Sequence, residues 1–252
     1  MEIKTYLINL EKDVERFRAM DQRLSAAEIP YERFPALTAD NLPNWLKPYL
    51  LDRLGNKPIE LSDGEIGCYA SHLSVMMKCL EDGETVLVLE DDLQFPPNFK
   101  SLIKLCLNFQ TPWDMLRLSS SDKRPVISLG ELTPEYQVVE YLRVPPNLGA
   151  YLVRPVGAQK FLSWSQPRWR PVDQDLRRPW ENDVHTIGIF PRPVLPNQFP
   201  SSIDSIGSRR RGRAKYSRDS RNGDKLRGLL YNFRRIGVGR TLHALATRAV
   251  NF

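Results

Sequence analysis

Short apolar runs of strand length alternate with longer stretches of helical periodicity along the first two hundred residues. The runs that predict strands occupy residues 4–9, 31–34, 85–89, 114–118, 137–141, 150–153 and 185–190. The periodic stretches that predict helices occupy residues 13–27, 62–80, 97–107 and 156–164. This alternation predicts an α/β fold whose sheet is mostly parallel early in the chain and mixed later.

The helix predicted from residue 62 has the clearest boundary signal. Ser62 and Glu65 have the spacing of a capping box, in which each side chain binds the other's backbone N–H group. Before this helix, residues 36–61 form a long connection that contains proline, with one helical turn expected around Trp45–Tyr49. Connections of this length are usually functional loops or insertions.

The charge is divided unevenly along the chain. From Ser205 onward there are thirteen Lys and Arg residues and two acids, a balance of +11 within a total of +6, so residues 1–204 carry −5. Residues 208–224 are basic and rich in helix breakers, which predicts a linker. Beyond them, residues 226–236 have amphipathic helical spacing, and Gly237 interrupts it. We therefore expect a globular domain over residues 1–206 and a basic linker with a helical tail over residues 207–252.

Composition narrows the class of protein. The 252 residues are 41% hydrophobic and 26% charged, as in ordinary soluble domains. Neither a signal peptide nor an apolar run long enough to span a bilayer is visible in the sequence. Cys68, Cys79 and Cys106 lack the spacing of a disulfide framework or a zinc site, so we expect reduced core thiols in a cytoplasmic protein.

The most informative residues are three adjacent acids, Glu90, Asp91 and Asp92, which follow a run typical of a buried parallel strand. Such strands end at the edge where open α/β sheets bind ligands. Alternation along an extended chain predicts that Glu90 and Asp92 point one way and Asp91 the other. A divalent cation, Mg²⁺ or Mn²⁺, would relieve their repulsion while bridging nucleotide phosphates. The alternative is a solvated acidic turn before Pro96.

Four segments carry further residues in a fixed order. They are Tyr6–Leu10 with Glu15–Arg16, Gly64–Leu73, Val86–Asp92, and Gly149–Leu152 leading through Gly157 to Asp173. In order and spacing over roughly residues 3–206, the chain resembles glycosyltransferase family 25, the bacterial lipopolysaccharide and lipooligosaccharide core glycosyltransferases, which also include the collagen galactosyltransferases. Residues 39–61 fit the family pattern poorly, and the tail past Ser208 lies outside it.

The resemblance implies a GT-A-like, Rossmann-type mixed sheet flanked by helices. It also implies a UDP-hexose donor, a Mn²⁺ or Mg²⁺ ion and inversion at the anomeric carbon. In this assignment Asp92 is the metal ligand, Glu90 contacts the metal or the ribose, and Asp91 serves either subsite.

Inversion needs a carboxylate that takes the proton of the acceptor hydroxyl, at some distance from the metal. We expect Asp173 to be this base, with Asp175 in reserve. The alternative is that Asp173 caps the short helix after Pro171.

A further set of residues is expected to contact the nucleotide or line the donor site: Ile8, Asn9, Leu10, Arg16, Ser71, His72 and Gln198. Asn9 ends a strand and Arg16 lies early in the next helix, where phosphates are often bound. Arg16 could equally form a surface ion pair, and helical spacing alone favours a core role for His72. A Cys68–His72 nucleophilic pair is possible at this spacing, but inversion needs no covalent intermediate.

The tail has three interpretations. A basic amphipathic helix suits an anionic membrane surface, which fits a glycolipid acceptor at the cytoplasmic face of the inner membrane. Nucleic-acid binding is disfavoured because no recognition fold appears and the main domain is acidic. The third interpretation is that the helix docks on the domain through its leucines.

Together with what the resemblance implies, these observations predict an inverting UDP-hexose glycosyltransferase that acts on a lipooligosaccharide or lipopolysaccharide core. Of the two donors considered, UDP-galactose is favoured over UDP-glucose, which would make the protein a β-galactosyltransferase. The alternatives are a metal-dependent nucleotidyltransferase or phosphatase, and a non-enzymatic adaptor that binds nucleic acid through its tail. Leu93, two residues after Asp91, disfavours a phosphatase, which would carry a second acid there.

Overall fold

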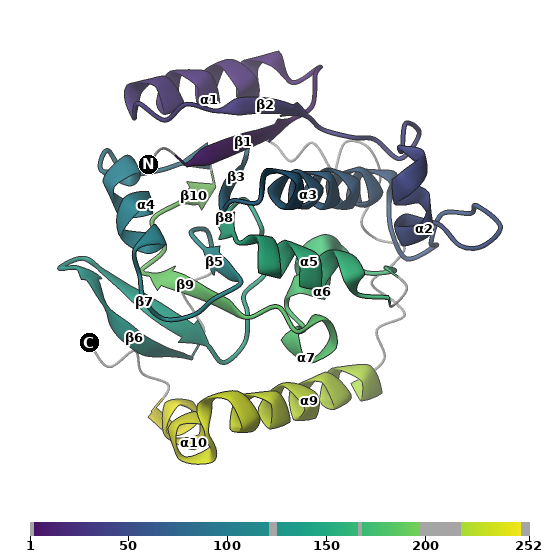
Figure 1. Ribbon diagram of the computed structural model, residues 1–252. Coiled ribbons are helices and arrows are strands. Elements are labelled where there is room, and N and C mark those ends of the chain that lie inside the picture. The colour runs from purple at the N-terminus through teal and green to yellow at the C-terminus, as the bar shows by residue number, and fades with distance from the viewer. Residues whose placement is uncertain (1–2, 121–124, 166–167, 197–217, 248–252) are drawn as a thin grey trace.

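A central sheet crosses the molecule in the computed structural model, which describes residues 3–120, 125–165, 168–196 and 218–247 (Figure 1). Its eight strands have the order β2-β1-β3-β8-β5-β9-β7-β6. They are β2 (Glu32–Pro35), β1 (Lys4–Asn9), β3 (Val86–Glu90), β8 (Ala150–Val153), β5 (Met115–Arg117), β9 (Thr186–Phe190), β7 (Tyr136–Tyr141) and β6 (Val126–Thr133). β8 and β7 run opposite to the other six. The expected α/β fold is confirmed, with a sheet that is parallel early and mixed later.

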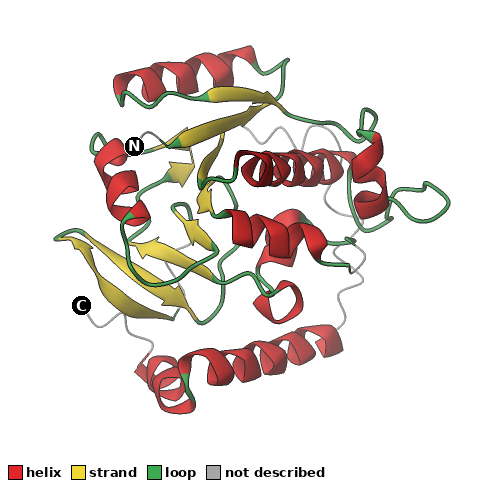
Figure 2. Ribbon diagram, in the orientation of Figure 1, coloured by secondary structure: helices red, strands yellow, loops and turns green. Residues whose placement is uncertain are grey.

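Helices cover both faces of this sheet (Figure 2). Alternate residues of the central strands enter different cores, so Tyr6 and Val88 pack on one face while Leu7 and Leu87 pack on the other. The first core is completed by α3 (Asp63–Asp82), α5 (Pro155–Ser163) and the short elements η1 (Asn44–Leu46), α2 (Lys47–Leu50) and α6 (Val172–Leu176). The second is completed by α1 (Val14–Ala26) and α4 (Phe99–Leu107).

Helix α3 begins as its capping box predicts. The Ser62 hydroxyl accepts from the Glu65 N–H at 3.2 Å, and the Glu65 carboxylate accepts from the Ser62 N–H at 2.9 Å. The helix ends at Gly83, whose φ of 67° is the left-handed conformation that glycine adopts without steric cost. The helical turn expected in the long connection is also present, as η1 and α2.

Several elements differ from the expectations. Strand β6 was not predicted because register shifts at Ser128/Gly130 and Glu131/Thr133 break the alternation that identifies a strand. The predicted linker over residues 208–224 is wrong at its end, since α9 (Arg218–Ile236) already begins at Arg218. A small second sheet of β4 (Leu93–Gln94) and β10 (Leu195–Pro196) was also not foreseen.

The tail helices α9 and α10 (Val238–Thr247) pack against the domain beside α7 (Pro179–Asn182) and the end of β7 (Figure 1). The Asp224 carboxylate pairs with Arg178 at 2.7 Å, and the Asn232 amide donates to the Leu142 carbonyl at 2.9 Å. Docking of the tail, one of its three interpretations, is therefore present. The contact includes the hydrogen bond of Asn232, whereas Leu226 and Leu230 of the leucine stripe are exposed and Leu229 is half-buried.

Candidate functional site

The candidate site lies at the carboxyl edge of the sheet, where several connections meet. Strands β1 and β3 are parallel neighbours with Ile8 opposite Glu90, so the residues that follow both strands share this edge. Strand β5 ends there at Arg117, and the antiparallel β8 starts there after Gly149. The topology therefore gathers Asn9, the three acids and the segment before β8.

Arg16 neutralises two of the three acids. Its guanidinium reaches from α1 to Asp91 at 2.7 Å and to Asp92 at 3.0 Å, and its side chain is only 12% exposed. The Asn9 amide donates to the second Asp91 oxygen at 2.6 Å, while the Asn9 carbonyl accepts from Arg33 at 2.6 Å. The alternative of a surface ion pair for Arg16 is wrong, because this pair is largely buried.

The three acids do not divide as strand alternation predicts. Asp91 and Asp92 both contact Arg16, whereas Glu90 reaches the His72 ring nitrogen Nε2 on α3 at 3.2 Å. The reason is that β3 ends at Glu90, so the next two residues no longer follow an extended chain. The expected grouping of Glu90 and Asp92 apart from Asp91 is therefore wrong as a description of their contacts.

The pKa values of the acids follow from their surroundings. Burial raises the pKa of Asp92 to about 6, and the charge of Glu90 adds to this effect against the opposing charge of Arg16. Burial also raises the pKa of Asp91, although Asn9 and Arg16 oppose it. For Glu90 burial acts in the same direction, but the hydrogen bond from His72 and nearby positive charge outweigh it and lower the pKa. The charge of Glu90 is therefore a cause, second to burial, of the raised pKa of Asp92.

Asp173 joins this edge through the segment before β8. Its carboxylate accepts from the Asn147 N–H at 3.3 Å, and the Asn147 side chain accepts from the Gly149 N–H at 2.8 Å. The Gly149 carbonyl in turn accepts from the Glu90 N–H at 2.8 Å. The helix-capping alternative is wrong for Asp173, which lies inside α6, while Pro171 is the capping residue.

Gly149 stands where a side chain would disturb the site. A Cβ atom there would lie 2.9 Å from the Leu93 side chain, 3.2 Å from the Asn147 side-chain oxygen and 3.5 Å from a Glu90 oxygen. The first of these distances is too short for a carbon contact. The absence of a side chain therefore lets the segment before β8 pass beside Glu90.

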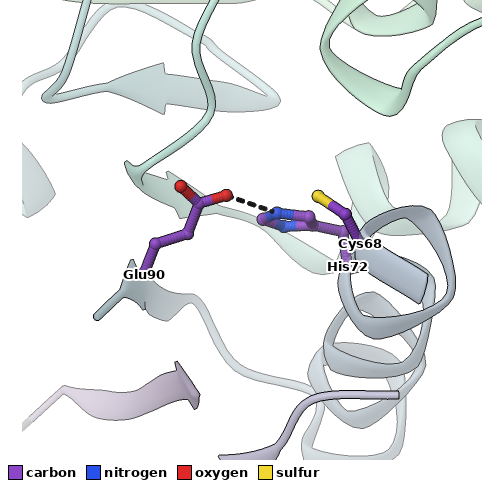
Figure 3. A group of neighbouring side chains, drawn as sticks. All are labelled: Cys68, His72 and Glu90. Atoms are coloured by element: carbon purple, nitrogen blue, oxygen red, sulfur yellow. Dashed lines mark hydrogen bonds and ion pairs between the residues drawn. The ribbon is translucent and has the colours of Figure 1, made fainter. Parts of the chain in front are cut away.

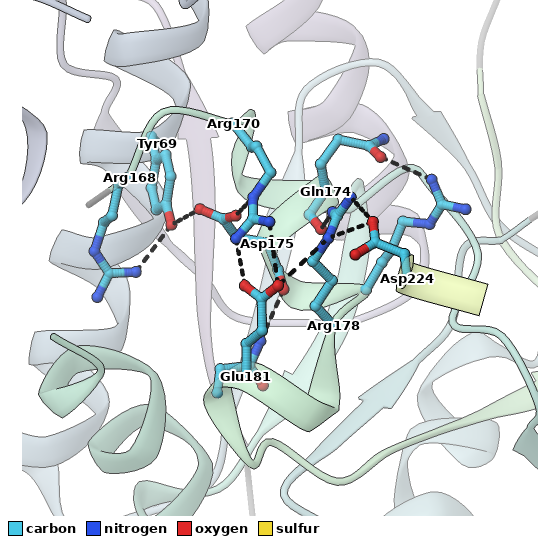
Figure 4. Close-up of polar contacts among 10 residues, drawn as sticks. Tyr69, Arg168, Arg170, Gln174, Asp175, Arg178, Glu181 and Asp224 are labelled. Atoms are coloured by element: carbon cyan, nitrogen blue, oxygen red, sulfur yellow. Dashed lines mark hydrogen bonds and ion pairs between the residues drawn. The ribbon is translucent and has the colours of Figure 1, made fainter. Parts of the chain in front are cut away.

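Asp175 has surroundings different from those of Asp173, although only one residue separates them, and Figure 4 shows the polar contacts of Asp175. It is fully buried, and its carboxylate binds the Tyr69 hydroxyl and the Arg170 guanidinium. Arg170 also binds Glu181, and Arg168 donates to the Tyr69 hydroxyl at 2.9 Å. These contacts correct the expectation of a reserve base, because this carboxylate has no exposed surface from which to reach an acceptor.

The remaining predicted residues divide between the site and the core. His72 is buried and its second ring nitrogen, Nδ1, lies 3.0 Å from the Tyr151 hydroxyl. The Ser71 hydroxyl donates to the Gly67 carbonyl and accepts from the Leu37 N–H, so it holds the chain at Leu37, which corrects its expected role in lining the donor site. Ile8 and Leu10 flank Asn9, whereas Gln198 lies outside the described residues.

Sequence reasoning missed several residues of this site, above all Arg117. Its side chain is fully buried at the end of β5, with its guanidinium 3.5 Å from the Pro145 carbonyl. Burial lowers the pKa of Arg117, while nearby tyrosines and the carboxylates of Asp173 and Glu90 raise it. The arginine thus supplies positive charge whose field reaches both acids. A charged residue in a short apolar strand was the only available signal.

The fold and the edge define an α/β protein with carboxylates, an arginine and a histidine at the ligand-binding edge of its sheet. Residues 2–176 match the family described as Glycosyltransferase family 25 (LPS biosynthesis protein), a span that contains the site from Asn9 to Asp173. The chain belongs to this family.

Individual relatives match smaller parts of their own chains. A Haemophilus influenzae protein is 30% identical over 101 residues, covering 40% of this chain and 36% of that protein. An Aedes aegypti protein named Glycosyltransferase 25 family member is 32% identical over 144 residues, covering 48% and 23%. A human protein named Inactive glycosyltransferase 25 family member 3 is 32% identical over 170 residues, covering 63% and 27%. The chain thus spans about a quarter to a third of these relatives.

Two solved structures overlap with the chain only loosely. A glycosyltransferase involved in the glycosylation of the major capsid of PBCV-1 has a TM-score of 0.32 at 12% identity, covering 63% of each chain. A197 from STIV has a TM-score of 0.37 at 10% identity, covering 80% of this chain and 97% of that chain. Overlap at this level carries no argument, so the fold rests on the strand order described above.

Proposed function

We propose that this chain catalyses transfer of a hexose, galactose in our assignment, from its UDP-sugar to a lipopolysaccharide or lipooligosaccharide core sugar, with inversion at the anomeric carbon. One observation carries the proposal. Within the span that matches the family, the fold brings Asp173 to the same sheet edge as Glu90 and Asp92, although about eighty residues separate them in sequence. Family membership alone would not suffice, since several relatives are named inactive or probably inactive.

The carboxylates of Glu90 and Asp92 offer the oxygen ligands that a hard divalent cation, Mn²⁺ or Mg²⁺, prefers. The charge of Glu90 helps to raise the pKa of Asp92, and a cation between them would relieve this repulsion. When bound, such an ion supplies positive charge to the departing diphosphate. Arg16, held at Asp91 and Asp92, adds positive charge at the same place, and Asn9 fixes Asp91 in this arrangement.

Asp173 is assigned as the general base. It would take the proton of the acceptor hydroxyl while the new C–O bond forms opposite the breaking bond to UDP. Its carboxylate is oriented by the Asn147 N–H at 3.3 Å and the Gln174 side-chain amide at 3.1 Å. Neither contact neutralises the carboxylate, so it can still accept a proton. Asp175 is excluded from this role by its complete burial.

The test is a panel of UDP-hexoses, with and without Mn²⁺ or Mg²⁺, and a soluble core oligosaccharide as the acceptor. Wild type is compared with Asp92→Asn and Asp173→Asn, and with Asp40→Asn, whose exposed carboxylate pairs only with Lys57 in a loop. NMR of the product reports its anomeric configuration, and calorimetry reports UDP binding.

We expect cation-dependent consumption of UDP-galactose and a β-linked product. Asp173→Asn should lower kcat by at least about 100-fold while UDP binding persists, because it removes the base. Asp92→Asn should abolish transfer, because it removes a ligand of the assigned cation, and Asp40→Asn should match wild type. Normal turnover by Asp173→Asn would overturn the base assignment. Phosphate release or nucleotidyl transfer without glycoside formation would favour the rival enzyme classes.

We further propose that the tail holds the enzyme against an anionic membrane, at the cytoplasmic face of the inner membrane. Among the described helices, none has the length and hydropathy needed to cross a bilayer. Leu226 and Leu230 on α9 share an exposed face with Arg227 and Arg234, by helical spacing. Apolar and basic side chains on one helical face suit an anionic lipid surface.

This attachment can be tested by co-sedimentation with vesicles that contain anionic or only zwitterionic lipids. The double variant Leu230→Ser/Leu242→Ser changes two side chains that are 48% and 51% exposed, so its fold should persist. The control is Leu54→Ser, which is 86% exposed in a distant loop. Binding to anionic vesicles should be lost only in the double variant. Equal binding by all three proteins would contradict the assignment.

A further inference from the structure

Three different potential metal ligands meet beside the carboxyl edge of the sheet (Figure 3). They are the thiol of Cys68, the imidazole of His72 and the carboxylate of Glu90, and their ligand atoms all lie within 4.8 Å of one another. Cys68 and His72 are one turn apart on α3, so they share a face of this helix. Glu90 reaches them from the end of β3. This is the one such group of three found among the residues that the structure describes.

The imidazole of His72 is oriented as a ligand would be. Its Nδ1 atom lies 3.0 Å from the Tyr151 hydroxyl, and its Nε2 atom faces Glu90 at 3.2 Å. The Tyr151 hydroxyl can either donate or accept in this contact. When it accepts from Nδ1–H, the lone pair of Nε2 becomes available. Metal-bound histidines usually have such a partner on their other nitrogen.

The helix that carries Cys68 and His72 is held rigidly. Its first turn is fixed by the capping box, and Gly67 packs against the connection before it. A Cβ atom at Gly67 would lie 2.4 Å from the Leu37 carbonyl oxygen, so the two backbones are in close contact. The Ser71 hydroxyl binds the same connection through the Leu37 N–H at 2.9 Å. The two ligands are therefore held in place before any ion arrives.

We propose that Cys68, His72 and Glu90 bind a thiophilic divalent cation of the zinc class. Thiolate and imidazole select such ions over Mg²⁺ and Mn²⁺, which prefer oxygen ligands alone. Three protein ligands leave a fourth position for water or another ligand. On binding, the Cys68 sulfur exchanges its proton for the bond to the metal, and that proton passes to solvent.

The site has a consequence for catalysis, which rests on the proposed function. Glu90 belongs both to this trio and to the Glu90–Asp92 pair assigned to Mn²⁺ or Mg²⁺. One carboxylate shared in this way makes occupation of the two positions competitive. Zn²⁺ therefore inhibits hexose transfer, and an excess of Mn²⁺ restores it. Binding of the ion itself does not depend on the transferase assignment.

The test uses Co²⁺ alone as a spectroscopic probe of the reduced protein. Cobalt bound to thiolate gives a near-ultraviolet charge-transfer band, and Zn²⁺ should abolish the band by displacement. The variants are Cys68→Ala, Cys68→Ser and Asp92→Asn. Cys106→Ala is the matched control, because it removes a thiol that is fully buried in the other core. Circular dichroism verifies that each variant is folded.

Wild type should show the band at one Co²⁺ per chain, and Asp92→Asn and Cys106→Ala should keep it. Both Cys68 variants should lose it and bind Zn²⁺ at least about 100-fold more weakly. A wild-type protein without the band, or a band that survives in folded Cys68→Ala, overturns the site. The band without turnover of any UDP-hexose keeps the site and rejects the proposed function. If the protein lacks the band but transfers a hexose without inhibition by Zn²⁺, the proposed function stands and the zinc-class site is rejected.

Discussion

Replacement of Asp92 by Asn should stabilise the protein at neutral pH in the absence of metal. The folded state raises the pKa of this carboxyl from 3.8 to about 6, mainly through burial and then through the charge of Glu90. Between these two values the folded state holds more protons than the unfolded chain. The free energy of unfolding therefore falls as pH rises through this window, and the whole penalty is present above about pH 6.

The magnitude follows from the rise in pKa. A rise of about two pKa units corresponds to about 3 kcal/mol at 1.36 kcal/mol per unit. Asparagine cannot ionise, so Asp92→Asn avoids this penalty, and Arg16 keeps its contact with Asp91 at 2.7 Å. We expect the variant to exceed wild type by up to about 3 kcal/mol at pH 7.5, with a difference that decreases towards pH 4.

The assay is urea unfolding followed by tryptophan fluorescence between pH 4.5 and pH 7.5, with a chelator present. The control is Asp40→Asn, whose carboxylate is 86% exposed and should change stability by less than about 0.5 kcal/mol at every pH. Saturating Mn²⁺ should stabilise wild type alone, by about 2.7 kcal/mol at 100 times its dissociation constant, which would offset most of this difference. A variant less stable than wild type at pH 7.5, or a difference independent of pH, would refute the reasoning.

Three further substitutions test other parts of the structure. Gly149→Ala should lower turnover of UDP-galactose at least tenfold and cost about 1–3 kcal/mol in urea unfolding, because its Cβ would lie 2.9 Å from the Leu93 side chain; unchanged kinetics would contradict this. Tyr69→Phe should cost about 1–3 kcal/mol through the lost hydroxyl partner of Asp175, with kcat unchanged; a selective loss of kcat would place Asp175 in catalysis. Asn232→Ala should speed limited proteolysis of the tail, because α9 loses a buried hydrogen bond; equal digestion rates would contradict the docked arrangement.

Local sequence patterns were sufficient to predict the helices and strands whose apolar runs or capping residues are distinctive. The runs at residues 4–9 and 150–153 predicted β1 and β8 to the residue, because each contains the consecutive apolar residues of a strand that is buried on both faces. Ser62 and Glu65 fixed the start of α3 because capping depends only on residues within one turn. Such signals are weak in β6, whose bulges break its alternation.

The sequence also located the acids of the candidate site, but it could not assign their partners. Spacing alone placed Glu90, Asp91 and Asp92 at the end of a buried strand, as the structure shows. Arg16 on α1 binds Asp91 and Asp92, whereas His72 on α3 binds Glu90. This division depends on how α1 and α3 pack on opposite faces of the sheet. Each of these partners lies far from the acids along the chain.

The two acids Asp173 and Asp175 show most clearly what tertiary structure decided. They lie two residues apart in the same short segment, and both were candidate bases. In the folded chain the Asn147 N–H faces Asp173 at the sheet edge, whereas Asp175 is buried with Tyr69 and Arg170. The function of a carboxylate depends on its solvent contact and its neighbouring charges, and distant segments supply both. The sequence by itself determined which residues carry charge, and only the packing of α3, α6 and the segment before β8 decided which of them remain available.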